Sequence, residues 1–299
     1  MSKLDKVKLN ASQHGRTFRN QLMVDYSRVL IPIQIEGGKS PIYCICGKGG
    51  YPLRFFRLLK YLHRDQPVYF FRSRGFEAGE NVETSIENIA ADYLNEIKKI
   101  QPQGPYNFLG ESSGGLVAYE MAQQLLQQGE KTLFLGLLDT YITSRMQLKK
   151  SAPLPIYLLV QKHFQTLTSG GIDGLIPYME YYSKLWDFKL HQFQTWLKKM
   201  KNWTRYGKLP DVFSHVSKSN RAASLAYYPQ PYPGAVVIFR AMRQAQFDGN
   251  GVDNGWGEIG IGNLVIHPMD CYHGNILFEP FVQRVAEKAN ECLNGSSDK

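Results

Sequence analysis

The sequence predicts an α/β fold with a mostly parallel central sheet flanked by helices. Short apolar runs that fit strands alternate with amphipathic stretches from about residue 41 to 139, and the same alternation resumes after about residue 235. Strands and helices in turn are typical of parallel strands joined by crossover helices, which cover both faces of the sheet.

The expected strands are short apolar segments that lie between turn signals. Continuous apolar runs of this kind favour strands that are buried on both faces. The segments are 28–35, 41–46, 68–71, 106–109, 132–138, 235–239 and 264–266.

The expected helices carry apolar residues three and four positions apart. They are predicted over 53–62, 85–100, 116–125 and about 277–293. Thr84 precedes Glu87 by three residues, which is the spacing of a capping box and predicts where the second of these helices begins.

The length of 299 residues suits one large domain that contains an insertion. Between about 141 and 225 no core strand is expected and aromatic helical stretches dominate, so we interpret this segment as a mostly helical insertion. We therefore expect a polar leader over 1–27, the domain over 28–293 and a tail over 294–299.

Composition and charge exclude several classes of protein. No apolar run reaches the roughly 18 to 20 residues that cross a bilayer, and residues 1–13 lack a signal-peptide core. The four cysteines show no metal-ligand spacing, and Cys44 and Cys46 are expected to be small buried side chains in a reducing cytoplasm. The net charge of +9 accompanies no nucleic-acid-binding motif, so it indicates solubility or steering of an acidic partner.

Residues 110–114 form a GxSxG motif centred on Ser112. A buried strand is predicted before the motif and an amphipathic helix directly after it, which is the setting of a nucleophile elbow. The small residues permit a sharp turn that raises the serine hydroxyl above the sheet edge. The alternative is a glycine-rich connector without a catalytic role.

A serine hydroxyl needs a base to take its proton, and the base needs an acid to orient it. Among the seven histidines we favour His273, in the loop before the last helix, over His267, at the end of the last strand. For the acid we favour Asp139, which ends an apolar strand, over Asp248.

The negative charge that develops on the substrate oxygen requires two backbone N–H donors. One is expected at Ser113, directly after the nucleophile, and the other in the glycine-rich loop 47–50. Within that loop Lys48 is the favoured donor and Gly49 is the alternative. A plain turn would explain the same glycines.

Several motifs together resemble the thioesterase domains of nonribosomal peptide and polyketide synthases, which are α/β-hydrolases. The resemblance covers about residues 28–293 and is loosest in the insertion. The motifs are Asp92-Tyr93, the run 101–106, the run 110–115, the run 118–122, the run 137–140, the run 228–234, Gly255-Trp256, His273 and Glu279-Pro280.

This resemblance implies an α/β-hydrolase fold with a triad of Ser112, His273 and Asp139 and a helical lid formed by the insertion 141–225. It implies a substrate held as a thioester on the phosphopantetheine arm of a carrier protein, and neither a cofactor nor a metal in the enzyme itself. Aromatic side chains of the lid are expected either to line the acyl channel or to pack internally. They include Tyr178, Tyr182 and Trp186.

The implied function is release of an acyl, polyketide or peptidyl chain through an acyl-enzyme, by hydrolysis or cyclisation. The alternative is an esterase or lipase that acts on diffusible esters, and a non-enzymatic reading is a binding module on the same fold. Two features depart from the family: Lys48 is larger than the residues usual in its loop, and the 27 leading residues are too few for a carrier domain.

Overall fold

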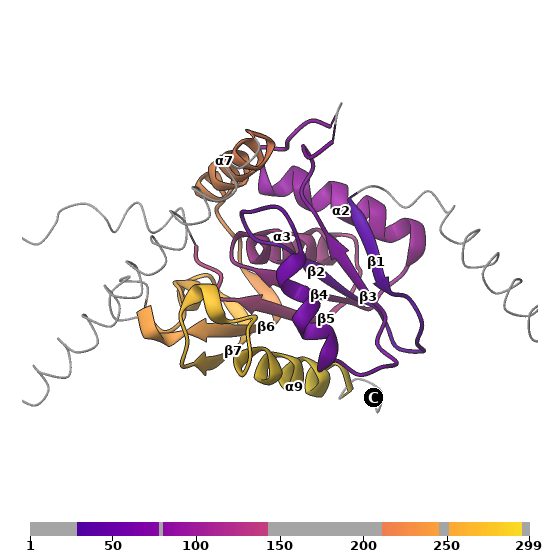
Figure 1. Ribbon diagram of the computed structural model, residues 1–299, viewed down its shortest axis with the longest axis vertical. Helices are drawn as coiled ribbons and strands as arrows, with labels where there is room; N and C mark the ends of the chain where they lie inside the picture. The colour runs from indigo at the N-terminus through magenta and orange to yellow at the C-terminus, as the bar shows by residue number, and fades with distance from the viewer. Residues whose placement is uncertain (1–28, 78–79, 143–210, 245–250, 295–299) are drawn as a thin grey trace, which may run out of the picture.

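A computed structural model describes residues 29–77, 80–142, 211–244 and 251–294. In this part of the chain the strands form one sheet in the order β1-β3-β2-β4-β5-β6-β7. Their bounds are Leu30–Gln34, Ile42–Ile45, Val68–Phe71, Tyr106–Glu111, Thr132–Leu138, Tyr232–Ala241 and Ile261–Met269 for β1 to β7. Figure 1 shows the sheet between two layers of helices.

Every pair of neighbouring strands in the sheet is parallel except β1 with β3. The predicted mostly parallel sheet with flanking helices is therefore confirmed. Parallel strands place their carboxyl ends at one edge of the sheet, where α/β proteins bind ligands. The ends of β4, β5 and β7 consequently lie along the edge at which the candidate residues follow.

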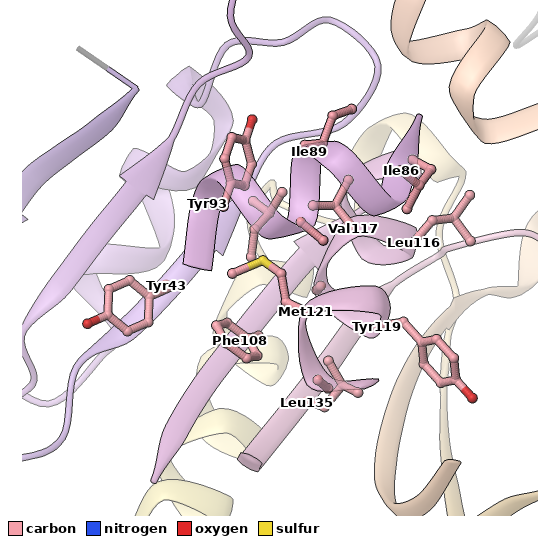
Figure 2. Close-up of a cluster of buried hydrophobic side chains, with 14 of the residues drawn as sticks. Tyr43, Ile86, Ile89, Tyr93, Phe108, Leu116, Val117, Tyr119, Met121 and Leu135 are labelled. Atoms are coloured by element: carbon pink, nitrogen blue, oxygen red, sulfur yellow. The ribbon is translucent and has the colours of Figure 1, made fainter. Parts of the chain in front are cut away.

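One face of the sheet is covered by α2 (Ile86–Ile100) and α3 (Ser113–Gln127). Figure 2 shows how the side chains of these two helices meet above the central strands. Tyr93 of α2 stacks on Phe71 of β3 with ring centroids 4.1 Å apart, and Met121 of α3 is fully buried. This apolar packing fixes the start of α3 relative to the sheet.

The opposite face is covered by η1 (Leu53–Lys60) and α9 (Phe281–Asn294). Phe55 and Leu58 of η1 are fully buried in a cluster that also holds Cys44 and Cys46. Burial raises the pKa of the Cys46 thiol to about 12, which matches its expected role as a small apolar side chain.

Two local predictions need correction. The segment 53–62 forms the 3-10 helix η1 and not an α-helix, and it ends at Lys60. The N-cap of α2 is Ser85 and not Thr84: Ser85 has an extended backbone, and its hydroxyl accepts a hydrogen bond from Asn88 N–H at 3.2 Å. Glu87 accepts from the Ser85 hydroxyl instead of closing a capping box.

Most of the predicted insertion, with the leader and most of the tail, lies outside the described residues. Of the predicted insertion, residues 141–142 and 211–225 are described, and the latter lie in helix α7 (Asp211–Ala226). Within the described residues no helix is long and apolar enough to span a membrane.

The start of α3 lies against the end of β2 at very short range. A Cβ added at Gly114 would come within 2.4 Å of the carbonyl oxygens of Ile45 and Cys46. Because these atoms belong to the backbone of a central strand, they cannot move aside without disturbing the sheet. The motif glycine thus lets the serine turn rest directly on the core.

We predict that Gly114→Ala lowers the free energy of unfolding by about 2 kcal/mol, although alanine normally stabilises a helix relative to glycine. The steric conflict with the β2 carbonyls outweighs helix propensity. Urea unfolding monitored by circular dichroism measures the change. Gly49→Ala is the control, since a Cβ there meets nothing within 4 Å, and equal stability of both variants would contradict the prediction.

Candidate active site

Ser112 lies between β4 and α3 in an unusual backbone conformation. Its φ is 54° and its ψ is −122°, a region that non-glycine residues rarely adopt. Its N–H donates to the carbonyl of Leu138 at 2.9 Å, and its carbonyl accepts from Gly115 N–H at 3.0 Å. These bonds tie both sides of the turn, so the neighbouring sheet and helix hold the strained serine.

Asp139 follows β5 directly and is fully buried. Its φ of 43° is also positive, and its N–H donates to the carbonyl of Phe239 in β6 at 2.8 Å. Both Ser112 and Asp139 therefore leave their strands through sharp turns at the same edge of the sheet. The predicted strand-end aspartate is a buried carboxylate and not a surface charge.

The two oxygens of the Asp139 carboxylate have different hydrogen-bond partners. Oδ1 accepts from Arg240 Nη1 at 2.9 Å, from Ala241 N–H at 3.0 Å and from Asn254 Nδ2 at 3.2 Å. The other oxygen, Oδ2, accepts from the hydroxyl of Tyr141 at 2.9 Å. Oδ2 is thus the oxygen left to face a histidine.

His273 faces that second oxygen. It begins η4 (His273–Asn275), beyond β7, and its Nδ1 lies 2.8 Å from Asp139 Oδ2. The half-buried imidazole also acts electrostatically on the buried carboxyl of Glu111, the residue before Ser112. The structure therefore brings His273 and Asp139 into hydrogen-bond contact, and it places His273 within electrostatic reach of Glu111, the residue before Ser112.

The charge balance at Asp139 favours its ionised form. Burial alone raises the pKa of this carboxyl, but the hydrogen bond from His273 and the positive charges of His273 and Arg240 outweigh burial and lower the pKa below its usual range. Asp139 is consequently a carboxylate at neutral pH, the form in which both of its oxygens accept hydrogen bonds.

The alternative residues do not join this group. His267 lies within β7, where its ring is 5.4 Å from the ring of Phe239, and its pKa is lowered by burial and by Lys288 of α9. His267 thus faces the helix layer and not the serine turn. Asp248, the other candidate acid, lies outside the described residues.

The two segments that carry the predicted oxyanion donors adjoin Ser112. Ser113 is the first residue of α3, so its N–H belongs to the helix terminus that has no partner within the helix. A Cβ added at Gly47 would come within 3.1 Å of Ser112 Cβ, so the loop that carries Lys48 lies against the serine. The carbonyl of Lys48 accepts from Asn220 of α7 at 3.3 Å.

Arg240, Tyr141 and Asn254 were not predicted from the sequence. Arg240 stands in an apolar strand and is fully buried, and its guanidinium also lies 5.3 Å from the Tyr141 ring centroid. A charged residue inside a run of buried apolar ones is the signal that could have identified it, because buried charges require partners. Tyr141 and Asn254 carry no such signal.

The lid residues expected to line an acyl channel, which are Tyr178, Tyr182 and Trp186, lie outside the described residues. In the described part of the chain no group of three or more histidine, cysteine, aspartate or glutamate side chains could hold a metal ion.

Comparison with known proteins identifies the segment that holds the serine turn. Residues 40–169 match the sequence profile of the thioesterase domain family. The resemblance seen in the sequence motifs is therefore confirmed over a segment that includes Ser112, Asp139 and the glycine-rich loop.

Two curated relatives of this thioesterase segment are synthetases. Atromentin synthetase of Tapinella panuoides is 40% identical over 119 residues, which cover 39% of this chain and 12% of the relative. A dimodular nonribosomal peptide synthase of Bacillus subtilis is 36% identical over 123 residues, which cover 41% of this chain and 5% of the relative. The chain spans only a small part of both relatives.

A solved structure confirms the fold over nearly the whole chain. The NocB thioesterase domain, crystallised as a covalent complex with a fluorophosphonate nocardicin G analog, matches 89% of this chain and 99% of its own. The TM-score is 0.60 at 19% sequence identity. The α/β-hydrolase fold predicted from the resemblance is therefore correct.

We predict that Asp139→Asn lowers the free energy of unfolding by about 3 kcal/mol, because it removes a negative charge that is ion-paired with the fully buried Arg240. The double variant with Arg240→Met should recover part of this loss, since the buried guanidinium that had faced Asp139 is then gone. Urea unfolding of the wild type, both single variants and the double variant measures the coupling. Strictly additive losses would contradict the prediction.

Proposed function

We propose that the chain is a serine thioesterase that releases an acyl, polyketide or peptidyl chain from the phosphopantetheine thioester of a carrier protein. The observation that carries the proposal is the hydrogen-bonded contact between the buried Asp139 and His273, together with a strained Ser112 turn in a segment that matches the thioesterase family. The roles of Ser112 as nucleophile, His273 as base and Asp139 as orienting acid are part of the proposal.

The first half of the reaction transfers the chain to the enzyme. Ser112 Oγ attacks the thioester carbonyl while His273 takes the hydroxyl proton, and a tetrahedral oxyanion forms. Its collapse breaks the C–S bond, and His273 returns the proton to the departing thiol. Asp139 remains a carboxylate throughout and stabilises the imidazolium, which its lowered pKa supports.

The second half regenerates the serine. Water, deprotonated by His273, attacks the ester, and the acid leaves as the proton returns to Ser112 Oγ. A hydroxyl or amine of the bound chain in place of water gives a ring. The backbone N–H groups of Ser113 and Lys48 are the proposed oxyanion donors, since both belong to segments that adjoin Ser112.

The phosphopantetheine-bearing carrier is the proposed macromolecular partner. Support comes from the relatives, whose names describe synthetases and a dimodular peptide synthase. We place the reaction in the cytoplasm, because all four cysteines are free thiols, as a reducing compartment requires.

We expect an acyl carrier protein loaded with a thioester to transfer its acyl group to Ser112. Intact-protein mass spectrometry of the quenched mixture should show an adduct with the mass of the acyl group. The adduct should be absent in Ser112→Ala, because alanine has no nucleophile at this turn.

Two outcomes would overturn the proposal. One is an adduct that persists in Ser112→Ala, which would place the acylated group elsewhere. The other is rapid turnover of diffusible esters with no reaction of the carrier thioester, which would establish an esterase instead. A carrier loaded through a non-hydrolysable amide serves as the control for noncovalent binding.

A further inference from the structure

Arg54 contacts two different segments of the candidate site at once. Its Nη1 donates to the carboxylate of Glu111, and its Nη2 donates to the carbonyl of Gly274 at 2.7 Å. Glu111 directly precedes Ser112, and Gly274 directly follows His273. One guanidinium therefore joins the residue next to the proposed nucleophile with the residue next to the proposed base.

Arg54 is presented by a firmly anchored element. It stands in η1 beside Phe55, which is fully buried, and Leu58 of the same helix is fully buried as well. The helix follows the glycine-rich loop that carries Lys48, and that loop touches the serine turn at Gly47. The position of Arg54 is consequently set by the core and by the same loop that adjoins Ser112.

Glu111 requires this partner. Its side chain is 5% exposed, whereas that of Arg54 is 34% exposed. Burial raises the pKa of the Glu111 carboxyl, and the positive charges of Arg54 and His273 oppose that rise. The thiol of Cys46, directly after β2, also interacts with it electrostatically. An unpaired carboxylate here would be a buried charge directly under the serine turn.

We propose that Arg54 is a positioning residue that holds the histidine loop against the serine turn through Glu111 and Gly274. The inference rests on the proposed roles of Ser112 and His273 and extends them. A planar guanidinium suits this task because its two terminal nitrogens can bind two acceptors in fixed directions, whereas the single ammonium of lysine is a point charge. The bridge sets the distance over which the serine proton must move.

The test compares the rates at which a fluorophosphonate probe labels Ser112 in the wild type, Arg54→Met and Arg54→Lys. Arg54→Met should label about 10- to 100-fold more slowly, since displacement of a catalytic group by about 1 Å has effects of this size. Arg57→Met is the matched control, because Arg57 is a half-exposed arginine of the same helix whose guanidinium lies over the ring of Phe278. This variant should label like the wild type. Thermal unfolding should be alike for Arg54→Met and Arg57→Met.

The pH dependence of labelling separates positioning from a general structural role. Without Arg54 the pKa of Glu111 rises further, because the positive charge that opposed the effect of burial is gone. When the pH exceeds this raised pKa, Glu111 ionises and its carboxylate lacks the guanidinium beneath the serine turn. The factor by which Arg54→Met labels more slowly than the wild type should therefore increase with pH. Adding Glu111→Gln to Arg54→Met should abolish this increase. Arg54→Lys should lose rate without this increase, because it keeps the charge and loses the bridge.

Each contrary result overturns a defined statement. Equal labelling of Arg54→Met and Arg57→Met would refute the inference, and full activity of Arg54→Lys would show that charge alone matters and refute the bridge. A wild type that fails to react with the probe would refute the proposed function and the inference with it. If the variants differ in probe labelling as expected but the wild type does not turn over a carrier thioester, only the proposed function is refuted.

Discussion

The carboxylate of Asp139 is buried completely, and donors from separate segments of the chain converge on it. Arg240 and the adjacent backbone N–H come from β6, Asn254 comes from the loop beyond it, and His273 comes from η4. A buried negative charge tolerates no missing partner, because its desolvation must be offset by hydrogen bonds and opposite charge. The requirements of this one group thus fix the relative positions of β5, β6 and the histidine loop.

The two carboxylate oxygens of Asp139 bind different groups. Arg240 and its neighbours occupy Oδ1, whereas Oδ2 faces His273 and the hydroxyl of Tyr141. Because Arg240 and Asp139 are both fully buried and Oδ1 accepts three hydrogen bonds, rotation of the carboxylate would break those bonds. Arg240 therefore orients the His273 imidazole indirectly, because the two side chains bind different oxygens of the same Asp139 carboxylate.

The positions of the strands along the chain, and the two candidate residues Asp139 and His273 that the structure brings into contact, could largely be predicted from local patterns. Buried runs such as 132–138 and the setting of Ser112 between strand and helix depend on neighbours in sequence, which periodicity detects. The choice of His273 over His267 also followed from position along the chain. His267 lies inside β7, where successive side chains alternate between the two faces of the sheet, and its side chain faces α9.

What escaped prediction depends on contacts between distant segments. Arg54 and Glu111 are 57 residues apart, and Arg240 lies 101 residues from Asp139. The antiparallel direction of β1 is likewise a property of pairing with β3 and not of its own residues. The N-cap at Ser85 was misplaced by one residue because both neighbouring hydroxyl side chains can cap a helix, and only the backbone angles decide.

The separation of 134 residues between Asp139 and His273 has a consequence for how the molecule is made. During synthesis the serine turn and the first five strands leave the ribosome well before β6 and β7, so the nascent chain holds the proposed nucleophile without the proposed base. In the proposed mechanism, completion of the fold by the last strands and the histidine loop is therefore also the step that brings the base to the serine.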